Sequence, residues 1–378
     1  MNILVIGEYY SSNLGDGVIC QIVVALLKQR HPNSNIDVVD ISNEVDYKDK
    51  RRVRTKYYEF QRKIDYYFRY RFFKKTEYRE NKYRFMHKKA YIKKMCRGNY
   101  DLAIFAGGQL FMDYFVFPIY YYVKYLSKRN IPIIFNACGS GPIHDKKLIR
   151  MMKKALNNEK IKSISTRDDL QKLQALYFDA YGSQIQKTFD PALCTEEVYD
   201  ITEIQTDKIG LGVIYCKNIT EEENLSIWRN IIRELEKRKL KWEIFCNGSP
   251  EDFAFGNRLL TYLGYSEKER MSHIAQRPQR PQELVDTISR YQKIISFRLH
   301  SHIIAYSLNI PSIALIWDEK LKFFFKKINH EERCLNALTS SKKVVDLLIE
   351  IEYEKEDSEL KEVQKGYLKE LLYTNIEL

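Results

Sequence analysis

The sequence lacks the long apolar runs, the leader segment and the paired cysteines that would place it among membrane-spanning or exported proteins. Its longest apolar stretches, at residues 102–106 and 131–137, fall far short of the ~20 residues that a spanning helix needs. Residues 1–7 carry no basic segment or cleavage site and predict a buried strand instead. The seven cysteines include no CxxC pair, which favours reduced thiols over disulfides or a zinc site. We therefore expect a cytoplasmic protein.

Several catalytic signatures are missing as well. No Ser-His-Asp arrangement, HExxH motif or DxD-type metal motif stands out. The glycine spacing after the first strand fits neither the dinucleotide fingerprint nor the Walker lysine loop. His300 and His302 have no nearby Cys, Asp or Glu to complete a metal site. We expect neither a metal nor a bound cofactor.

One segment accounts for the whole net positive charge of the chain. The 378 residues suffice for two domains, since ~100–200 residues is typical of one, and a 44% hydrophobic content excludes global disorder. The net charge of the chain is +12, but residues 47–97 alone carry 20 Lys and Arg against five Asp and Glu, a net +15. The same segment holds 14 Tyr and Phe and no proline, which favours helices.

Three interpretations of this arm, residues 47–97, remain open. Its aromatic side chains could pack on the body of the protein while its cations face water. It could instead bind an anionic membrane surface, where each basic residue gains roughly 1 kcal/mol and Tyr and Phe settle at headgroup level. Nucleic-acid binding is disfavoured, because no DNA- or RNA-binding motif accompanies the charge. The membrane is the stronger of the two functional interpretations.

Outside the arm, short apolar strands alternate with helical segments, which predicts an α/β protein with parallel sheets. The pattern weakens over residues 194–206 and then restarts. We expect two Rossmann-like doubly wound domains facing a cleft, the GT-B-like architecture. The expected parts are an N-terminal domain at 1–195 with the arm as its insertion, a C-terminal domain at 207–352 and a C-terminal helix at 353–378.

Three glycine-bearing loops follow strands of the first domain, at the edge where open α/β sheets bind ligands. The first contains Asn13, Gly15 and Asp16, and Asp16 could equally cap the following helix. The second contains Gly107 and Gly108, where a tight turn is an equally good explanation. The third begins near Gly139 and ends in a proline. Together the loops predict the floor of a binding cleft.

Arg298 and His300 are the most informative pair. They follow a hydrophobic strand expected at 293–298, and residues two apart in an extended chain point to one face. A guanidinium can clamp a carboxylate or phosphate, and a histidine can exchange protons near neutral pH. The plainer alternative is that Arg298 pairs with a structural carboxylate and His300 caps the next helix. Arg167 and Lys320, which also follow strands, could add cations, whereas Asp190 reads as structural before its proline.

In these blocks the sequence resembles the polysaccharide pyruvyl transferase family. The resemblance covers most of the chain except residues 47–97 and the C-terminal end, and the order of the blocks is more specific than any one of them. The family usually has three glycines in the second block, where this chain has Ala106 first. The blocks are Asn13-Leu14-Gly15-Asp16, Gly107-Gly108, Gly139-Ser140-Gly141-Pro142, Ser165-Thr166-Arg167-Asp168, Asp190-Pro191-Ala192-Leu193, Arg298-Leu299-His300 and Asp318-Glu319-Lys320.

The resemblance implies transfer of the pyruvyl group of phosphoenolpyruvate to two hydroxyls of a sugar, forming a cyclic ketal, in bacterial capsule, exopolysaccharide or cell-wall polymer synthesis. It implies catalytic roles for Arg298 and His300, with Arg167 as a further cleft arginine. Phosphoenolpyruvate is then a co-substrate, and a lipid-linked oligosaccharide acceptor would explain a membrane-binding arm on the inner face of the cell membrane. Two other functions stay open: a metal-independent glycosyltransferase using a nucleotide sugar, and a membrane adaptor without activity.

Overall fold

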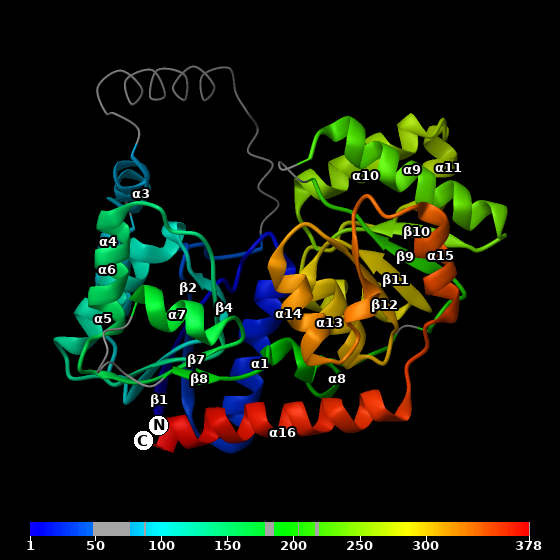
Figure 1. Ribbon diagram of the computed structural model, residues 1–378. Coiled ribbons are helices and arrows are strands. Elements are labelled where there is room, and N and C mark those ends of the chain that lie inside the picture. Colours follow the sequence, from blue (N-terminus) through cyan, green and yellow to red (C-terminus); the bar gives the residue numbers. More distant parts are fainter. Residues whose placement is uncertain (48–75, 87, 178–184, 203, 216–218, 378) are drawn as a thin grey trace. The chain divides into compact units, whose positions relative to one another are not determined.

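The computed structural model describes residues 1–378 except 48–75, 87, 178–184, 203, 216–218 and 378. The chain divides into two compact units, each with its own parallel sheet (Figure 1). The first unit comprises residues 1–10, 31–187 and 374–378, and the second comprises residues 11–30 and 188–373.

The first unit is built on a six-stranded sheet in the order β2-β1-β3-β5-β7-β8, and every pairing in it is parallel. Its central strands β1, β3 and β5 are almost wholly apolar, as strands buried on both faces must be, whereas β2, β7 and β8 also carry polar residues. They are β1 (Asn2–Gly7), β2 (Asn35–Asp40), β3 (Leu102–Phe105), β5 (Ile133–Phe135), β7 (Ile161–Thr166) and β8 (Ile185–Lys187). A separate pair, β4 (Gly108–Phe111) with β6 (Cys138–Ser140), was not expected from the sequence.

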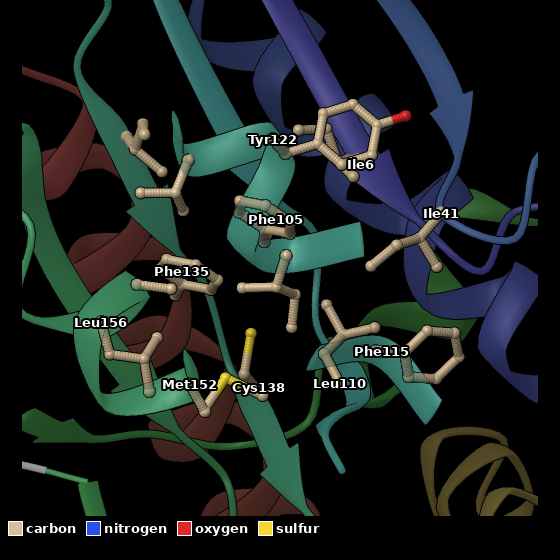
Figure 2. Close-up of a cluster of buried hydrophobic side chains, with 14 of the residues drawn as sticks. Ile6, Ile41, Phe105, Leu110, Phe115, Tyr122, Phe135, Cys138, Met152 and Leu156 are labelled. Atoms are coloured by element: carbon tan, nitrogen blue, oxygen red, sulfur yellow. The ribbon is translucent and has the colours of Figure 1, made fainter. Parts of the chain in front are cut away.

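The core of the first unit centres on stacked aromatic rings. The rings of Phe105 and Phe135, on neighbouring strands, lie 4.2 Å apart and nearly parallel, and Tyr122 meets Phe105 edge-on (Figure 2). The helices of this unit are α3 (Glu77–Met86), α4 (Lys89–Met95), the 3-10 turn η1 (Asp113–Phe115), α5 (Val116–Ser127), α6 (Lys146–Leu156) and α7 (Leu170–Tyr177).

The second unit has a five-stranded parallel sheet in the order β10-β9-β11-β12-β13. Its strands are β9 (Ile209–Gly212), β10 (Trp242–Phe245), β11 (Lys293–Ser296), β12 (Ser312–Ile316) and β13 (Cys334–Asn336). Its helices are α1 (Leu14–Arg30), η2 (Pro191–Cys194), α8 (Thr195–Val198), α9 (Glu221–Lys237), α10 (Pro250–Tyr262), α11 (Glu267–His273), α12 (Pro281–Ser289), α13 (Leu299–Ser307), α14 (Glu319–Lys327), η3 (Glu331–Arg333), α15 (Ser341–Glu350) and α16 (Lys355–Glu377), whose end belongs to the first unit.

The units differ from the expected domain ranges in one informative way. Helix α1 follows β1 in the chain, yet it packs against η2, α12, α8 and α13 and so belongs with the second unit. Its buried side is largely apolar, from Leu14 through Leu27, which provides a broad surface for packing against these helices. Residues 188–195, expected in the first domain, also lie in the second unit.

Two strand predictions need correction. The short strand expected at 188–190 lies earlier, at β8, because Asp190 is the N-cap of η2 and its side chain accepts a hydrogen bond from Ala192 N. The strand expected to run through Arg298 ends at Ser296, because helix α13 already begins at Leu299.

The described part of the arm packs on the first unit. Phe85 of α3 is buried and stacks on Phe117 and Tyr121 of α5, and Ile92 of α4 is buried in the same core. Lys89 lies over the ring of Tyr121. Most of the arm, residues 48–75, lies outside the described residues, and so does its expected helical structure.

Burial accounts for the state of the cysteines. None of the six cysteines in the described part of the chain forms a disulfide. Burial raises the pKa of Cys96, Cys194 and Cys246 to about 12, which keeps these thiols protonated and unreactive.

Of the helices that the structure describes, none combines the length and the apolar character that crossing a bilayer requires.

Candidate active site

Arg298 and His300 stand at the start of helix α13, where strand β11 has ended. Arg298 is the N-cap of the helix and keeps an extended backbone, whereas His300 is already helical. The expectation that both residues are extended and point to one face is therefore wrong. Their placement at the carboxyl edge of the second sheet, next to the N-terminus of a helix, holds.

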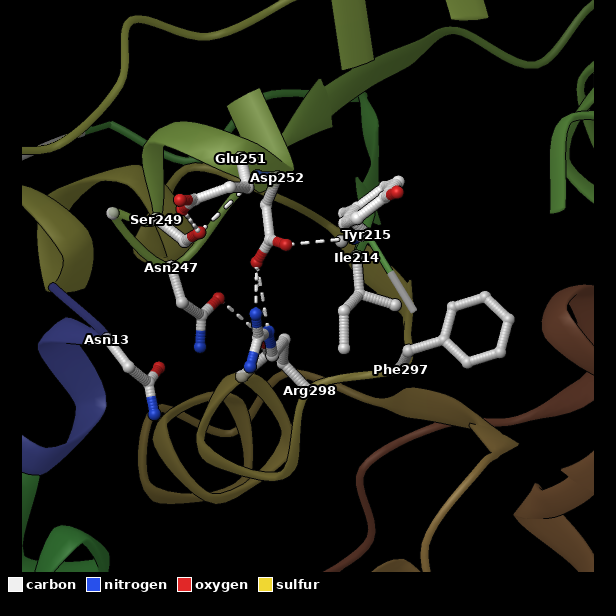
Figure 3. A network of polar contacts seen from close by, with 12 residues as sticks. Asn13, Ile214, Tyr215, Asn247, Ser249, Glu251, Asp252, Phe297 and Arg298 are labelled. Atoms are coloured by element: carbon white, nitrogen blue, oxygen red, sulfur yellow. Dashed lines mark hydrogen bonds and ion pairs between the residues drawn. The ribbon is translucent and has the colours of Figure 1, made fainter. Parts of the chain in front are cut away.

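Arg298 pairs with a buried carboxylate. Its Nε donates to Asp252 Oδ2 at 3.0 Å, and its Nη2 donates to the same oxygen (Figure 3). Asp252 lies in the first turn of α10 and is 1% exposed; burial raises the pKa of its carboxyl, while Arg298 opposes that change. The structure thus shows the structural carboxylate that the plainer interpretation of Arg298 expected. The Arg298 side chain is still 21% exposed, and a guanidinium carries five N–H donors.

His300 lies between two carboxylates. Its Nδ1 is 4.0 Å from Asp16 Oδ1, and its Nε2 is 3.9 Å from Asp190 Oδ2. Each aspartate uses its other oxygen structurally, since Asp16 Oδ2 accepts from Asn13 Nδ2 and Asp190 Oδ1 accepts from Ala192 N. All these groups belong to the second unit. Asp16 therefore sits inside the first turn of α1 and faces His300, rather than capping the helix.

Gly15 makes the approach of α1 to His300 possible. A Cβ built on Gly15 would lie 2.3 Å from His300 Nδ1 and 2.4 Å from its Cβ and Cγ. Side chains larger than hydrogen are thus excluded while the imidazole keeps its position. The sequence predicted a glycine that admits a ligand, whereas the structure places the His300 ring against it.

Asn247 joins the same cluster from the end of β10. Its Oδ1 accepts from Ser301 Oγ at 2.8 Å, and its backbone oxygen accepts from Leu14 N at 2.9 Å, which ties α13 and α1 together. Asn247 Nδ2 and Asn13 Oδ1 are buried and have no hydrogen-bond partner within the described part of the chain. Buried polar atoms rarely remain without partners, so this cluster has bonding capacity for a ligand or water.

The first unit carries a separate group of predicted residues. Gly107 and Gly108 have φ values of 111° and 84°, a conformation that favours glycine. Ser140 N donates to Asp168 Oδ2 at 2.6 Å, beside Arg167. A Cβ on Gly139 would lie 3.0 Å from Asp168 Oδ2, 3.1 Å from Arg167 Nε and 3.4 Å from Gly108 O. The structure thus brings Gly108, Gly139 and Arg167 together, in support of one shared loop cluster.

Lys320 lies apart from these groups in the chain, in the first turn of α14. Its Nζ is 3.1 Å from Asp318 Oδ2, and Asp318 caps the helix.

His302 is fully buried, with its ring nitrogens 3.0 Å from Ser312 Oγ and Ser296 O. Burial lowers the pKa of His302 to about 4, so its ring is neutral and structural. Among the described residues no cluster of His, Cys, Asp or Glu could hold a metal.

Three site residues escaped prediction from the sequence: Asp190, Asp252 and Asn247. Asp190 stands in one of the blocks that resemble the family, but the proline after it indicated a structural role. Asp252 follows Ser249-Pro250, the usual start of a helix, and nothing local shows that its carboxylate meets Arg298. Asn247 follows a strand at the ligand-binding edge, and that position was the available signal.

The fold is shared with sugar-nucleotide enzymes of low sequence identity. One is a Staphylococcus aureus MnaA–UDP co-structure (TM-score 0.60, 10% identity, 100% of this chain and 96% of that chain covered). Another is a putative UDP-N-acetylglucosamine 2-epimerase from Listeria monocytogenes (TM-score 0.59, 10% identity, 99% and 94% covered). The UDP-GlcNAc 2-epimerase from Methanocaldococcus jannaschii is similar (TM-score 0.58, 10% identity, 99% and 100% covered). These likenesses confirm the expected α/β class with two Rossmann-like, GT-B-like units.

Sequence comparison identifies the family. Among curated proteins, none matches this chain in sequence. The model of one family, described as polysaccharide pyruvyl transferase, matches residues 13–319. This match spans most of the chain, from the Asn13 loop to the start of α14, and includes Arg298 and His300. The chain belongs to the polysaccharide pyruvyl transferase family.

Proposed function

We propose that the protein transfers the pyruvyl group of phosphoenolpyruvate to two hydroxyls of one sugar as a cyclic ketal, in the synthesis of a bacterial surface polysaccharide. Family membership supports a transferase acting on polysaccharide. The observation that carries the proposal is the start of α13, where Arg298 is held by Asp252 and His300 lies between Asp16 and Asp190.

Arg298 is the proposed donor-binding residue. Phosphoenolpyruvate carries a carboxylate and a phosphate, and a guanidinium suits both. Asp252 fixes one side of the guanidinium and leaves its remaining N–H donors for the substrate. The first N–H groups of α13 add partial positive charge at the same point. Lys320, which like Arg298 belongs to the second unit, is proposed as a further cation for the donor, and Arg167 is proposed as a substrate-binding cation of the first unit.

His300 is the proposed proton donor. Protonation of the vinyl carbon C3 makes C2 electrophilic, one sugar hydroxyl attacks C2 and loses its proton, and a second hydroxyl then displaces phosphate from C2 and loses its proton. An imidazole exchanges protons near neutral pH, and the two carboxylates beside His300 can balance the charge of the ring while it carries the proton to be donated. This arrangement suits His300 for protonating C3 as a general acid, which should raise the reaction rate about 10²–10⁴-fold.

The main competing function is a glycosyltransferase that uses a nucleotide sugar, since a GT-B-like fold serves both reactions. A thermal-shift screen separates the two. Phosphoenolpyruvate at 100 times its dissociation constant should stabilise the protein by about 2.7 kcal/mol, and nucleoside diphosphates should not. Stabilisation by nucleoside diphosphates alone would refute the proposal and support the competing function.

The arm at residues 47–97 is proposed to bind the anionic inner face of the cell membrane and so bring the enzyme to a lipid-linked oligosaccharide. Its net charge of +15 supports this location. The aromatic side chains of Tyr78 and Phe85 in α3, which pack on α5, anchor the arm to the first unit. The exposed Tyr83 and Met86 of α3 are suited to contact lipid headgroups.

A further inference from the structure

Two exposed aromatic residues, Tyr215 and Trp317, have no role in the site described above. Tyr215 comes shortly after β9 and is 39% exposed, and Trp317 comes directly after β12 and is 36% exposed. Strands β9 and β12 are the two neighbours of β11, the strand that leads to Arg298. The two aromatic residues therefore follow strands on opposite sides of Arg298, at the carboxyl edge of one sheet.

Hydrogen bonds tie both residues to the surroundings of Arg298. The indole Nε1 of Trp317 donates to Phe297 O at 2.6 Å, one peptide unit from Arg298. The backbone N–H of Tyr215 donates to Asp252 Oδ1 at 2.8 Å, on the carboxylate whose other oxygen holds Arg298 (Figure 3). A single exposed aromatic side chain is ordinary on a protein surface, but two that are held on either side of one partly exposed arginine are not.

The rings are also fixed in orientation. Phe297 is fully buried and meets Trp228 edge-on, so the carbonyl that holds the indole of Trp317 is part of the core. The guanidinium of Arg258 lies over the Tyr215 ring, 5.7 Å from its centroid. A ring that is held before binding costs less conformational entropy when a ligand stacks on it.

We propose that Trp317 and Tyr215 form an acceptor platform, on which a sugar ring of the acceptor stacks beside the donor bound at Arg298. The inference rests on the proposed function and names the residues that bind its second substrate. The face of an aromatic ring is electron-rich and attracts the polarised C–H groups on the apolar face of a sugar. Strands β9 and β12 are separated by about 10 Å, two strand spacings, which is wide enough for one or two sugar rings.

Tryptophan fluorescence tests the platform without any turnover. The chain has three tryptophans, and Trp228 and Trp242 are buried at 0% and 4% exposure. Trp317 should therefore report saccharide binding. We expect saturable quenching or a blue shift when the full-length protein is titrated with methyl glycosides of hexoses and N-acetylhexosamines. The signal should vanish in Trp317→Ala, and in Tyr215→Ala the sugar should bind at least tenfold more weakly. An unchanged spectrum across the whole panel would overturn the inference.

Kinetics on an accepted glycan provide the second readout. Trp317→Ala and Tyr215→Ala should raise the KM for the glycan about tenfold and leave the KM for phosphoenolpyruvate unchanged. Tyr262→Ala is the matched control, because Tyr262 is a 45% exposed aromatic residue at the far end of α10, about 15 Å along the helix from Asp252. Wild-type glycan KM in both platform variants would overturn the inference.

The two readouts also separate this inference from the proposed function. Saccharide binding that depends on Trp317, without release of phosphate from phosphoenolpyruvate, would keep the platform and refute pyruvyl transfer. Pyruvyl transfer with a normal glycan KM in both variants would support the proposed function and refute the platform.

Discussion

Replacing Gly15 with alanine tests whether α1 really positions His300. Gly15 lies within α1 and its φ is not positive, so alanine could adopt the same backbone conformation. The added Cβ would lie 2.3–2.4 Å from three atoms of His300, including its Cβ. The Cβ of His300 is bonded directly to the backbone of α13, so rotation of the imidazole ring cannot relieve the clash. Either α1 or α13 therefore has to shift.

The expected magnitude follows from two opposing effects. Overpacking of this kind costs about 1–3 kcal/mol, and we expect the upper end because the contact involves Cβ and Cγ. Alanine in place of glycine in a helix contributes about 1 kcal/mol in the other direction. The net loss of stability should be about 2 kcal/mol. Catalysis should fall on the order of 100-fold, because a displacement of about 1 Å in a catalytic group has that effect.

Gly366→Ala is the matched control for stability. Gly366 is an exposed glycine inside α16, and a Cβ built on it meets no atom within 4 Å. This variant should be as stable as wild type or more stable by up to about 1 kcal/mol, with unchanged activity. Thermal melting and phosphate release measure both quantities. Wild-type stability and activity in Gly15→Ala would refute the account of how α1 meets His300.

Three further predictions concern charge. Asp190→Asn keeps an oxygen for the η2 cap but removes one of the two carboxylates beside His300, so kcat should fall while the melting temperature changes little; a wild-type kcat would contradict the proposed role of this carboxylate pair. Burial lowers the pKa of His302 to about 4, so between pH 6.5 and 4 only the unfolded chain binds its proton, and the free energy of unfolding should fall by about 3 kcal/mol as pH drops through that window. His302→Gln should flatten this part of the stability curve, and an equal slope in both proteins would refute the assignment. Deletion of residues 48–75 should spare turnover of a soluble acceptor but abolish binding to vesicles containing anionic lipid, and equal binding to neutral vesicles would remove the membrane proposal.

Variants of Arg298 need a different design because of Asp252. Arg298→Ala leaves a buried carboxylate without its cation, which costs about 3–5 kcal/mol and confuses activity with stability. Arg298→Lys keeps the charge but loses the planar fork of donors. We expect the lysine variant to fold and to bind phosphoenolpyruvate at least tenfold more weakly. Wild-type affinity in that variant would show that Arg298 serves only to hold Asp252.

The alternation of strands and helices was readable from the sequence because it depends on local pattern. The apolar run of β1 and the charged, amphipathic α9 with its Thr220–Glu223 capping box are examples. The end of β11 was predicted two residues too late because the apolar residue Phe297 follows the strand directly. The placement of α1 in the second unit was not readable, because a helix with apolar residues on most sides can join either core.

The candidate site was readable only as separate blocks. Arg298, His300 and Asp16 were identified from residue chemistry and their positions after strands. Contacts such as His300 with Asp190, or Arg298 with Asp252, join residues 110 and 46 positions apart and depend on tertiary packing. A buried carboxylate on a helix start looks the same in the sequence whether it caps the helix or holds an arginine.

The most direct test of pyruvyl transfer is product analysis in D₂O. The full-length protein is incubated with phosphoenolpyruvate and a panel of acceptor glycans, and released phosphate is compared with the modified glycan by mass spectrometry and NMR. The account predicts equal amounts of phosphate and glycan ketal, with one deuterium in the ketal methyl group, and loss of both in His300→Ala. Phosphate release without a ketal, or a ketal formed equally well by His300→Ala, would contradict it.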